Sequence, residues 1–152
     1  MIQTHLKEAI SRVMETMFFL PVQFADGPRP LGEWFSCEAN VLEALIDFQG
    51  SRSGRGFLLV PVKGLKEMAA NFLGLREAEV NIEQVQDTLK EAVNMMIGQM
   101  LSLLDRGGGY ALGIPRFAGA TNLSEAREQN NPAALLVFET EKTHLAAGVI
   151  ES

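Results

Sequence analysis

Apolar residues recur along the chain with two different periods, which separate helices from strands. Over residues 3–19 they return every three or four positions, as on the buried side of a helix. The same period runs from about Ile82 to Leu104, with Asn81 suited to cap the start and Gly107 to Gly109 ending the pattern. A shorter helical pattern precedes Gly74, at residues 65–72. The chain is therefore predicted to contain two long helices and a short one.

Alternation of apolar and polar residues begins after Glu33 and predicts strands. One alternating set runs from Phe35 through Cys37 and Ala39 to Val41, and a second, in the opposite phase, from Leu42 to Phe48. The slip between Val41 and Leu42 predicts a bulge or a strand break. Gly50 to Gly56 is rich in glycine, serine and arginine, but it opens no helix, so a hairpin turn is favoured over a phosphate-binding loop. Further strands are predicted at residues 57–62, 110–117, 134–140 and 145–150, the last two as a hairpin.

This order of elements predicts an α+β fold in which the helices pack on one face of a mostly antiparallel sheet. With 152 residues, 47% of them hydrophobic, the chain is sized for a single domain spanning residues 1–152. Residues 26–32 and 121–132 are polar or rich in proline and glycine, and are predicted to be loops. Pro115 is expected to end or bend the strand that contains it.

Charge and composition exclude several classes of function. A net charge of −6 argues against nucleic acid as a partner, because binding to phosphates needs a surplus of lysine and arginine. No apolar run approaches a membrane span, and the polar, periodic start is unlike a signal peptide, so we expect a cytoplasmic protein. One cysteine, Cys37, excludes an internal disulfide and is expected to be a buried thiol. His5 and His144 have no metal-ligand spacing, so no metal site is expected.

The long central helix carries a narrow polar stripe. At about 100° per residue, Asp87, Glu91, Asn94 and Gly98 fall within about 60° of one another. Apolar residues occupy the other side of the helix, so it can bury that side while presenting a carboxylate and an amide to a partner. Gly98 leaves a dent on the same stripe. By spacing alone a solvated helix surface is the favoured explanation, since Lys90 lies three residues after Asp87 and four before Asn94.

The spacing D-x3-E-x2-N-x3-G, with the LGIPRF run at Leu112 to Phe117 downstream, resembles the CheC/CheX/FliY family of chemotaxis phosphatases. The order of elements resembles the CheX-like branch. This resemblance implies a phosphatase that removes phosphate from the aspartyl-phosphate of a CheY-like response regulator. It implies that Asn94 orients the attacking water and that Glu91 pairs with a lysine of the receiver domain. Asp87, Gly98 and Pro115 would bind the partner, which would supply Mg²⁺, and the phosphatase itself would need no cofactor.

The resemblance also implies a homodimer, and it draws attention to the first helix. There Ser11, Glu15 and Phe18 repeat the motif spacing with phenylalanine in place of the amide. Phenylalanine cannot orient water, so we expect this copy to be inert, and an ordinary first helix explains the same residues equally well. The alternative function is a non-catalytic interaction domain that binds a receiver or a switch-like assembly through the same face of the central helix.

Overall fold

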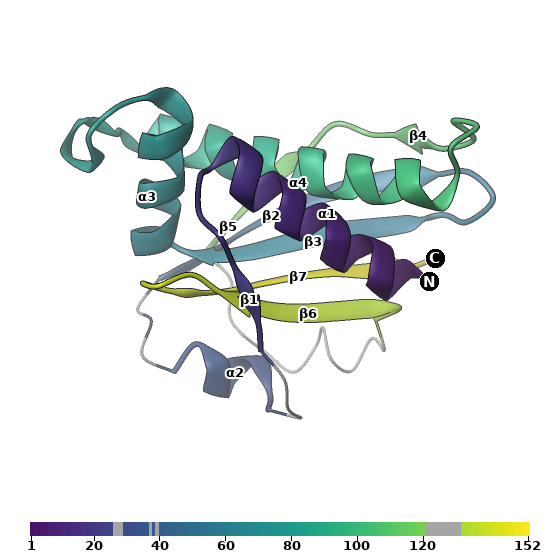
Figure 1. The fold of residues 1–152 in the computed structure, drawn as a ribbon, viewed down its shortest axis with the longest axis horizontal. Coiled ribbons are helices and arrows are strands. Elements are labelled where there is room, and N and C mark those ends of the chain that lie inside the picture. Colours follow the sequence, from purple (N-terminus) through teal and green to yellow (C-terminus); the bar gives the residue numbers. More distant parts are fainter. Residues whose placement is uncertain (26–28, 37, 39, 121–131) are drawn as a thin grey trace.

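The computed structural model is built around one seven-stranded antiparallel sheet. It describes residues 1–25, 29–36, 38, 40–120 and 132–152. The strand order is β1-β6-β7-β3-β2-β4, and β5 also pairs with β2 (Figure 1). The three predicted helices pack on one face of this sheet, which confirms the α+β class.

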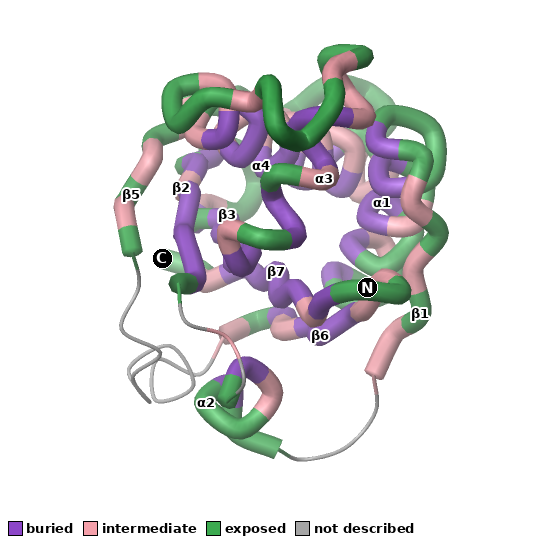
Figure 2. The backbone as a smooth tube through the Cα atoms, turned by 90° about the vertical axis from the view of Figure 1, so that its left-hand side faces the viewer, coloured by how far each residue is buried: buried purple, intermediate pink, exposed green. Residues whose placement is uncertain are grey.

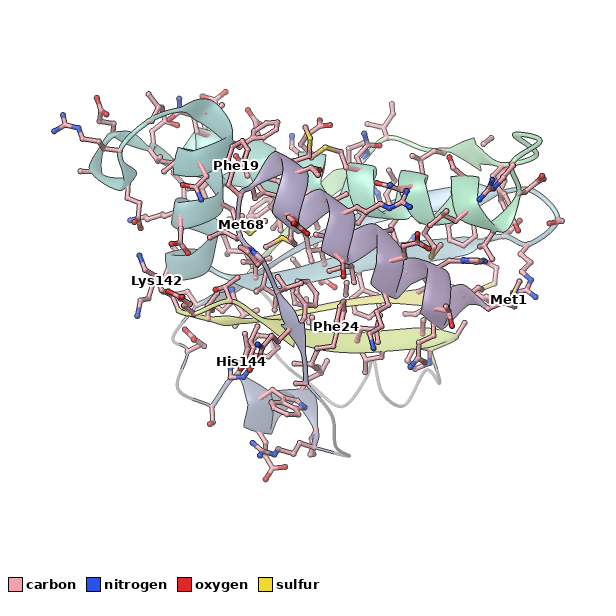
Figure 3. All side chains as sticks on the ribbon, viewed as in Figure 1. Met1, Phe19, Phe24, Met68, Lys142 and His144 are labelled. Carbon is pink, nitrogen blue, oxygen red and sulfur yellow. The ribbon has the colours of Figure 1, made fainter. Side chains whose placement is uncertain are left out.

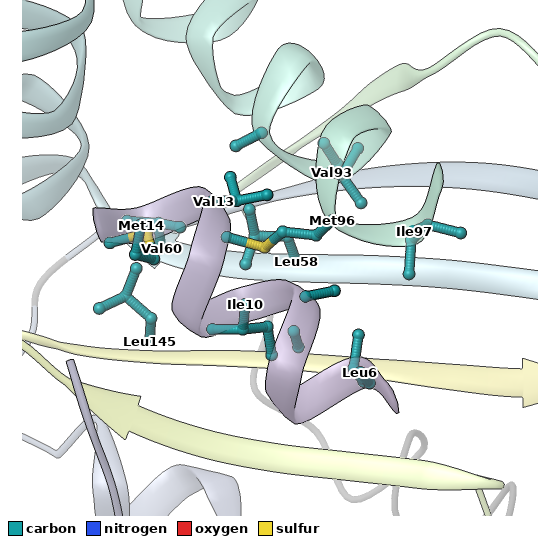
Figure 4. Packing of buried hydrophobic residues seen from close by; sticks show 14 of the residues in the cluster. Leu6, Ile10, Val13, Met14, Leu58, Val60, Val93, Met96, Ile97 and Leu145 are labelled. Carbon is teal, nitrogen blue, oxygen red and sulfur yellow. The ribbon is translucent and has the colours of Figure 1, made fainter. Parts of the chain in front are cut away.

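The helical layer consists of α1 (Ile2–Met17), α3 (Val62–Leu73) and α4 (Ile82–Leu104). Figure 1 shows α1 and α4 side by side over the sheet. Their buried residues lie on the sides that face inward, and their exposed residues on the outside (Figure 2). In the core, Ile10, Val13 and Met14 of α1 lie with Met96 of α4 above the sheet, as Figure 4 shows.

The central strands form two hairpins that pair with each other. β2 (Val41–Gln49) pairs with β3 (Gly54–Pro61), and β6 (Ala134–Glu139) pairs with β7 (His144–Glu151), which also pairs with β3. Both predicted hairpins are confirmed, and residues 50–53 form the turn between β2 and β3. A two-residue strand, β1 (Gln23–Phe24), adds to β6 at one edge.

The strand predicted from Phe35 to Val41 is wrong. Residues 31–34 form a short helix, α2 (Leu31–Trp34), followed by a turn, and β2 begins only at Val41. Pro30 precedes α2 with extended backbone, and Leu31 and Phe35, four residues apart, are both buried against the second face of the sheet. The slip at Val41 was therefore a strand boundary. Cys37, predicted to be buried, lies outside the described residues, as does most of the predicted loop at 121–132.

The strand predicted at residues 110–117 is split in two. β4 (Ala111–Leu112) and β5 (Arg116–Ala120) both pair with β2 along its outer edge. Leu112 lies opposite Phe48 and Arg116 opposite Leu45, so four residue steps on one side face three on the other. The chain between them must bulge, and the bend predicted at Pro115 lies in this bulge. A short 3-10 helix, η1 (Glu77–Glu79), completes the fold.

Candidate functional site

The start of α4 is fixed by a reciprocal cap. The Asn81 side chain accepts a hydrogen bond from the Gln84 N–H at 2.8 Å, and the Gln84 side chain accepts one from the Asn81 N–H at 3.0 Å. This satisfies two of the backbone donors that a helix start leaves free. Asn81 is thus the N-cap that its position predicted, and α4 begins at a defined residue.

One side of α4 is held by the core from Val85 to Leu101. The buried set comprises about two residues per turn over this stretch, and each is at most 4% exposed: Val85, Thr88, Leu89, Ala92, Val93, Met96, Ile97, Met100 and Leu101. Burying this much apolar surface prevents the helix from rotating, because rotation would bring polar residues into the core. The orientation of the opposite, polar side is therefore set by packing.

The four predicted stripe residues lie on that polar side. Asp87 is exposed, and Glu91, Asn94 and Gly98 are half-buried. Residues three or four apart on a helix are neighbours, about 5–6 Å between β-carbons, so Glu91 and Asn94 form one surface. Within the described part of the chain, neither side chain has a hydrogen-bond or ion-pair partner. Their donors and acceptors are available to another molecule.

Asp87 is paired with a neighbour on its own helix. Its carboxylate lies 3.3 Å from the Lys90 ammonium, with Asp87 63% exposed. An exposed ion pair of this kind contributes little to stability and exchanges readily with water or another charge. Asp87 can therefore pair with a basic group of a partner, whereas the surrounding fold does not depend on it.

Leu112 of the same chain lies close to Gly98. A β-carbon on Gly98 would lie 3.3 Å from Cδ2 of Leu112, in β4. Beside this contact is a hollow of about 210 Å³, lined by Ser102, Asp105 and Tyr110 together with Gly98 and Leu112. The dent predicted at Gly98 is thus partly filled by Leu112, and the partner contact predicted for Gly98 stays a prediction.

The β4–β5 segment runs back along α4 from its end. Asp105, which follows α4, accepts a hydrogen bond from the Gly109 N–H at 3.2 Å, and Leu112 then lies at Gly98. Figure 1 shows the segment leaving β4 and passing α4 on its way to β5. The bulge that contains Pro115 therefore follows Leu112 along the side of α4 where the polar stripe lies.

Asp47 fastens this bulge to the sheet. Its backbone carbonyl accepts a hydrogen bond from the Gly113 N–H at 2.8 Å. Its carboxylate accepts one from Arg55 at 2.7 Å and lies 3.5 Å from the Arg116 guanidinium. The hydrogen bond from Arg55 lowers the pKa of Asp47 below its ordinary value. Sequence reasoning missed Asp47, because its role depends on strand pairing that no local pattern reveals.

The second motif copy lies on α1, where Phe18 belongs to the core. Phe18 is fully buried, and its ring centroid lies 5.4 Å from that of Phe72 on α3. Glu15 is exposed and Ser11 is half-buried. The Phe18 backbone carbonyl accepts a hydrogen bond from the Asn71 side chain at 2.8 Å. Phe18 ends α1, and its side chain fills the core. The first helix therefore presents no counterpart of Asn94.

Another hollow, larger than the one at Gly98, lies away from the stripe. It has a volume of about 740 Å³ and lies between the segment after α1, α3 and the β6–β7 turn, with Phe19, Glu67 and Lys142 in its lining. Figure 3 shows Phe19 and Lys142 at the same end of the molecule. The hydrogen bond between Lys142 and Glu67 raises the pKa of Lys142. Among the helices of the described residues, none contains an apolar stretch of the length that a membrane span requires.

Comparisons with known proteins relate the chain to one family. The family model described as chemotaxis phosphatase CheX matches residues 42–139, which is more than half of the chain. A search of curated proteins finds no match.

Solved structures of several proteins share the fold over nearly the whole chain. The chemotaxis protein CheX from Vibrio vulnificus is 18% identical, with a TM-score of 0.76, covering 99% of this chain and 96% of that one. CheX from Desulfovibrio desulfuricans is 14% identical, with a TM-score of 0.69 and 99% of both chains covered. A chain of the CheX–CheY–BeF3–Mg complex from Borrelia burgdorferi is 14% identical, with a TM-score of 0.68, covering 97% of this chain and 96% of that one.

The matched region contains β2, β3, α3, the whole of α4 with its polar stripe, and the bulge beside it. The structural neighbours extend the likeness to α1 and β7. The chain therefore belongs to the CheX family of chemotaxis phosphatases.

Proposed function

We propose that this protein hydrolyses the aspartyl-phosphate of a CheY-like receiver domain, using Glu91 and Asn94 of α4. The observation that carries the proposal is the position of these two side chains and their lack of partners within the described residues. They are one helical turn apart, half-buried and without a partner in the described chain, on a helix whose orientation is fixed by its buried side. Polar groups kept in one geometry without a structural role are suited to bind another molecule.

Asn94 has the chemistry to position a water molecule. Hydrolysis of an acyl phosphate requires water to attack phosphorus in line, while the bond from phosphorus to the aspartate oxygen breaks and the carboxylate leaves. A side-chain amide offers one acceptor oxygen and two N–H donors, and it does not titrate. Asn94 would therefore hold the water by hydrogen bonds, and its contribution is to position the nucleophile.

Glu91 and Asp87 supply the charge for docking. A carboxylate at Glu91 would pair with a lysine of the receiver's active site and so align Asn94 with the phosphorus atom. Asp87, one turn earlier, would bind a further basic group in exchange for Lys90. The receiver brings the phosphorylated aspartate and its Mg²⁺, so the phosphatase requires no cofactor of its own.

Two facts support the partner. The family is described as a chemotaxis phosphatase. The Borrelia burgdorferi neighbour is named as a complex of CheX with CheY, BeF3 and Mg²⁺. We carry that partner class over to this chain as part of the proposal, together with a cytoplasmic location and a homodimer. Gly98 and Pro115 are proposed to flank the docked receiver.

The alternative is an interaction domain that binds a receiver without accelerating hydrolysis. The same carboxylates on α4 would serve it, and Asn94 would then be one more polar contact. The two functions differ in what loss of the amide does. For a phosphatase, removal of Asn94 abolishes the rate enhancement and leaves binding intact. For an interaction domain there is no rate enhancement to lose.

The test is phosphate release from a panel of phosphorylated receiver domains of the source organism, with wild type, Asn94→Ala, Glu91→Ala and the control Gln99→Ala. Gln99 is an amide on the same helix about 140° from Asn94. We expect wild type and Gln99→Ala to accelerate phosphate loss from one receiver, Asn94→Ala to bind it without acceleration, and Glu91→Ala to bind more weakly. Binding by wild type without faster release would contradict the proposal and favour the interaction domain.

A further inference from the structure

The most exposed large apolar side chain in the described part of the molecule is Ile114, at 84%. It lies in the bulge between β4 and β5, next to Pro115. Single exposed apolar residues are common on protein surfaces, so exposure alone indicates no function. What distinguishes Ile114 is how firmly it is held and where it lies.

Its backbone is held on both sides. Before it, Gly113 donates to the Asp47 carbonyl at 2.8 Å, and a β-carbon on Gly113 would lie 3.1 Å from that same oxygen. After it, Pro115 restricts Ile114 to extended backbone, and Arg116 resumes pairing with β2 opposite Leu45. The isoleucine is therefore presented on a fixed bulge, and little conformational entropy is lost when a partner binds it.

Its position follows from two spacings. Leu112 lies at Gly98, and from there the chain runs toward the start of α4. One helical turn from Gly98 to Asn94 covers about 6 Å. Two residues of extended chain from Leu112 to Ile114 cover about 6–7 Å. These two spacings would bring Ile114 to about the level of Asn94, on the side of α4 where Leu112 lies.

The resulting surface combines two kinds of contact. The acidic and amide groups of the stripe lie on α4, and an apolar pair, Ile114 with the 37% exposed Leu112, lies beside them. An apolar anchor next to a few polar groups is the usual composition of a protein interface. The apolar pair is continuous with the surface to which the proposed function assigns a receiver domain.

We propose that Ile114, flanked by Leu112, is the apolar anchor by which the receiver domain docks on this protein. The inference rests on the proposed function and adds a division of roles to it. Ile114 contributes to the affinity for the receiver and takes no part in the chemical step, whereas Asn94 acts in the chemical step. Burial of one isoleucine side chain against a partner corresponds to about tenfold or more in the dissociation constant.

The test compares Ile114→Ser with the matched control Ile82→Ser. Ile82 is 64% exposed at the first position of α4, about 18 Å along the helix from Asn94. The probe is the receiver that wild type dephosphorylates, loaded with Mg²⁺ and beryllofluoride for binding and phosphorylated for kinetics. We expect Ile114→Ser to raise Kd and KM about tenfold with kcat retained, Ile114→Ala to raise them less, and Ile82→Ser to match wild type.

Three results would overturn the inference. If Ile114→Ser binds the receiver within twofold of wild type while Asn94→Ala has lost the rate enhancement, the function stands and the anchor does not. If Ile114→Ser dissociates a dimer and leaves receiver binding unchanged, the occupant is a second copy of this chain. If wild type neither binds nor dephosphorylates any receiver, the proposed function fails and the inference fails with it.

Discussion

Ile97 of α4 lies directly on Gly56 of β3, so that a β-carbon on the glycine would overlap the isoleucine side chain. Gly56 pairs with Ile46 in β2 and with Val149 in β7, at the centre of the sheet. The absent side chain lets α4 approach the sheet closely, which sets how far the polar stripe stands above it.

We expect Gly56→Ala to lower the free energy of unfolding by about 1–3 kcal/mol, because the added methyl overpacks a filled core. Urea denaturation of wild type and variant measures this change. Ile97→Val removes one methyl group from the same contact and is expected to cost about 1 kcal/mol alone. The double variant should lose less unfolding free energy than the sum of the losses in the two single variants. Full additivity would contradict the contact.

The cap at the start of α4 gives a second prediction. Asn81→Ala removes the acceptor for the Gln84 N–H and should lower the free energy of unfolding by about 1 kcal/mol. Asn81→Ser keeps an acceptor at this position and should retain most of the stability. Equal losses in the two variants would show that the side-chain oxygen does not act as the cap.

Asn94 is expected to contribute nothing to folding. Its side chain has no partner in the described chain, and alanine is the better helix former, so Asn94→Ala should raise the free energy of unfolding by about 0.5 kcal/mol. Thermal and urea denaturation test this independently of any activity measurement. A loss of more than about 1 kcal/mol would mean that the amide has a structural role.

The pH dependence of stability should reveal the ion pair at the bulge. Arg55 lowers the pKa of the Asp47 carboxyl in the folded protein, so the stabilisation is present at neutral pH and is lost as the pH falls through that lowered pKa. Asp47 is 53% exposed, so we expect Asp47→Asn to cost less than about 1 kcal/mol at pH 7. The difference between variant and wild type should vanish in acid, and a difference that persists there would assign it to another cause.

Glycine at position 98 is predicted to favour docking of the receiver and to lower the stability of α4. Gly98→Ala should raise the free energy of unfolding by up to about 1 kcal/mol, because glycine is unfavourable inside a helix and the exposed tip of Leu112 can shift by the few tenths of an ångström required. The same variant should bind the receiver more weakly, since the methyl group occupies the docking surface. A lower stability of Gly98→Ala would show that the Leu112 side chain cannot shift to make room for the methyl group.

Much of this fold could be predicted because its determinants are local. The period of α4, its cap at Asn81 and the grouping of Glu91 with Asn94 depend only on helical geometry, and all three are present in the structure. The residues around Phe35 misled because their alternation is compatible with a strand. Leu31 and Phe35 instead lie on one side of a helical turn, and burial against the second face of the sheet decides between the two.

The surroundings of the stripe could not be predicted. Leu112 covers Gly98 and Ile114 projects from a bulge because of the register of β4 and β5 against β2. That register can be determined only when the pairing of the strands is known. The LGIPRF run marked the segment, and Pro115 marked the bend, but neither indicated which residue would face solvent.

Among the residues that the structure describes, none is a structural partner of Glu91 or Asn94, and this has an evolutionary consequence. Substitutions at these positions can accumulate without passing through poorly folded intermediates, because the core of α4 is built by other residues. Under the proposed function, single amino-acid replacements on the polar side of α4 would remove or restore hydrolysis in a descendant of this chain. The buried side of α4 would preserve the fold in either case.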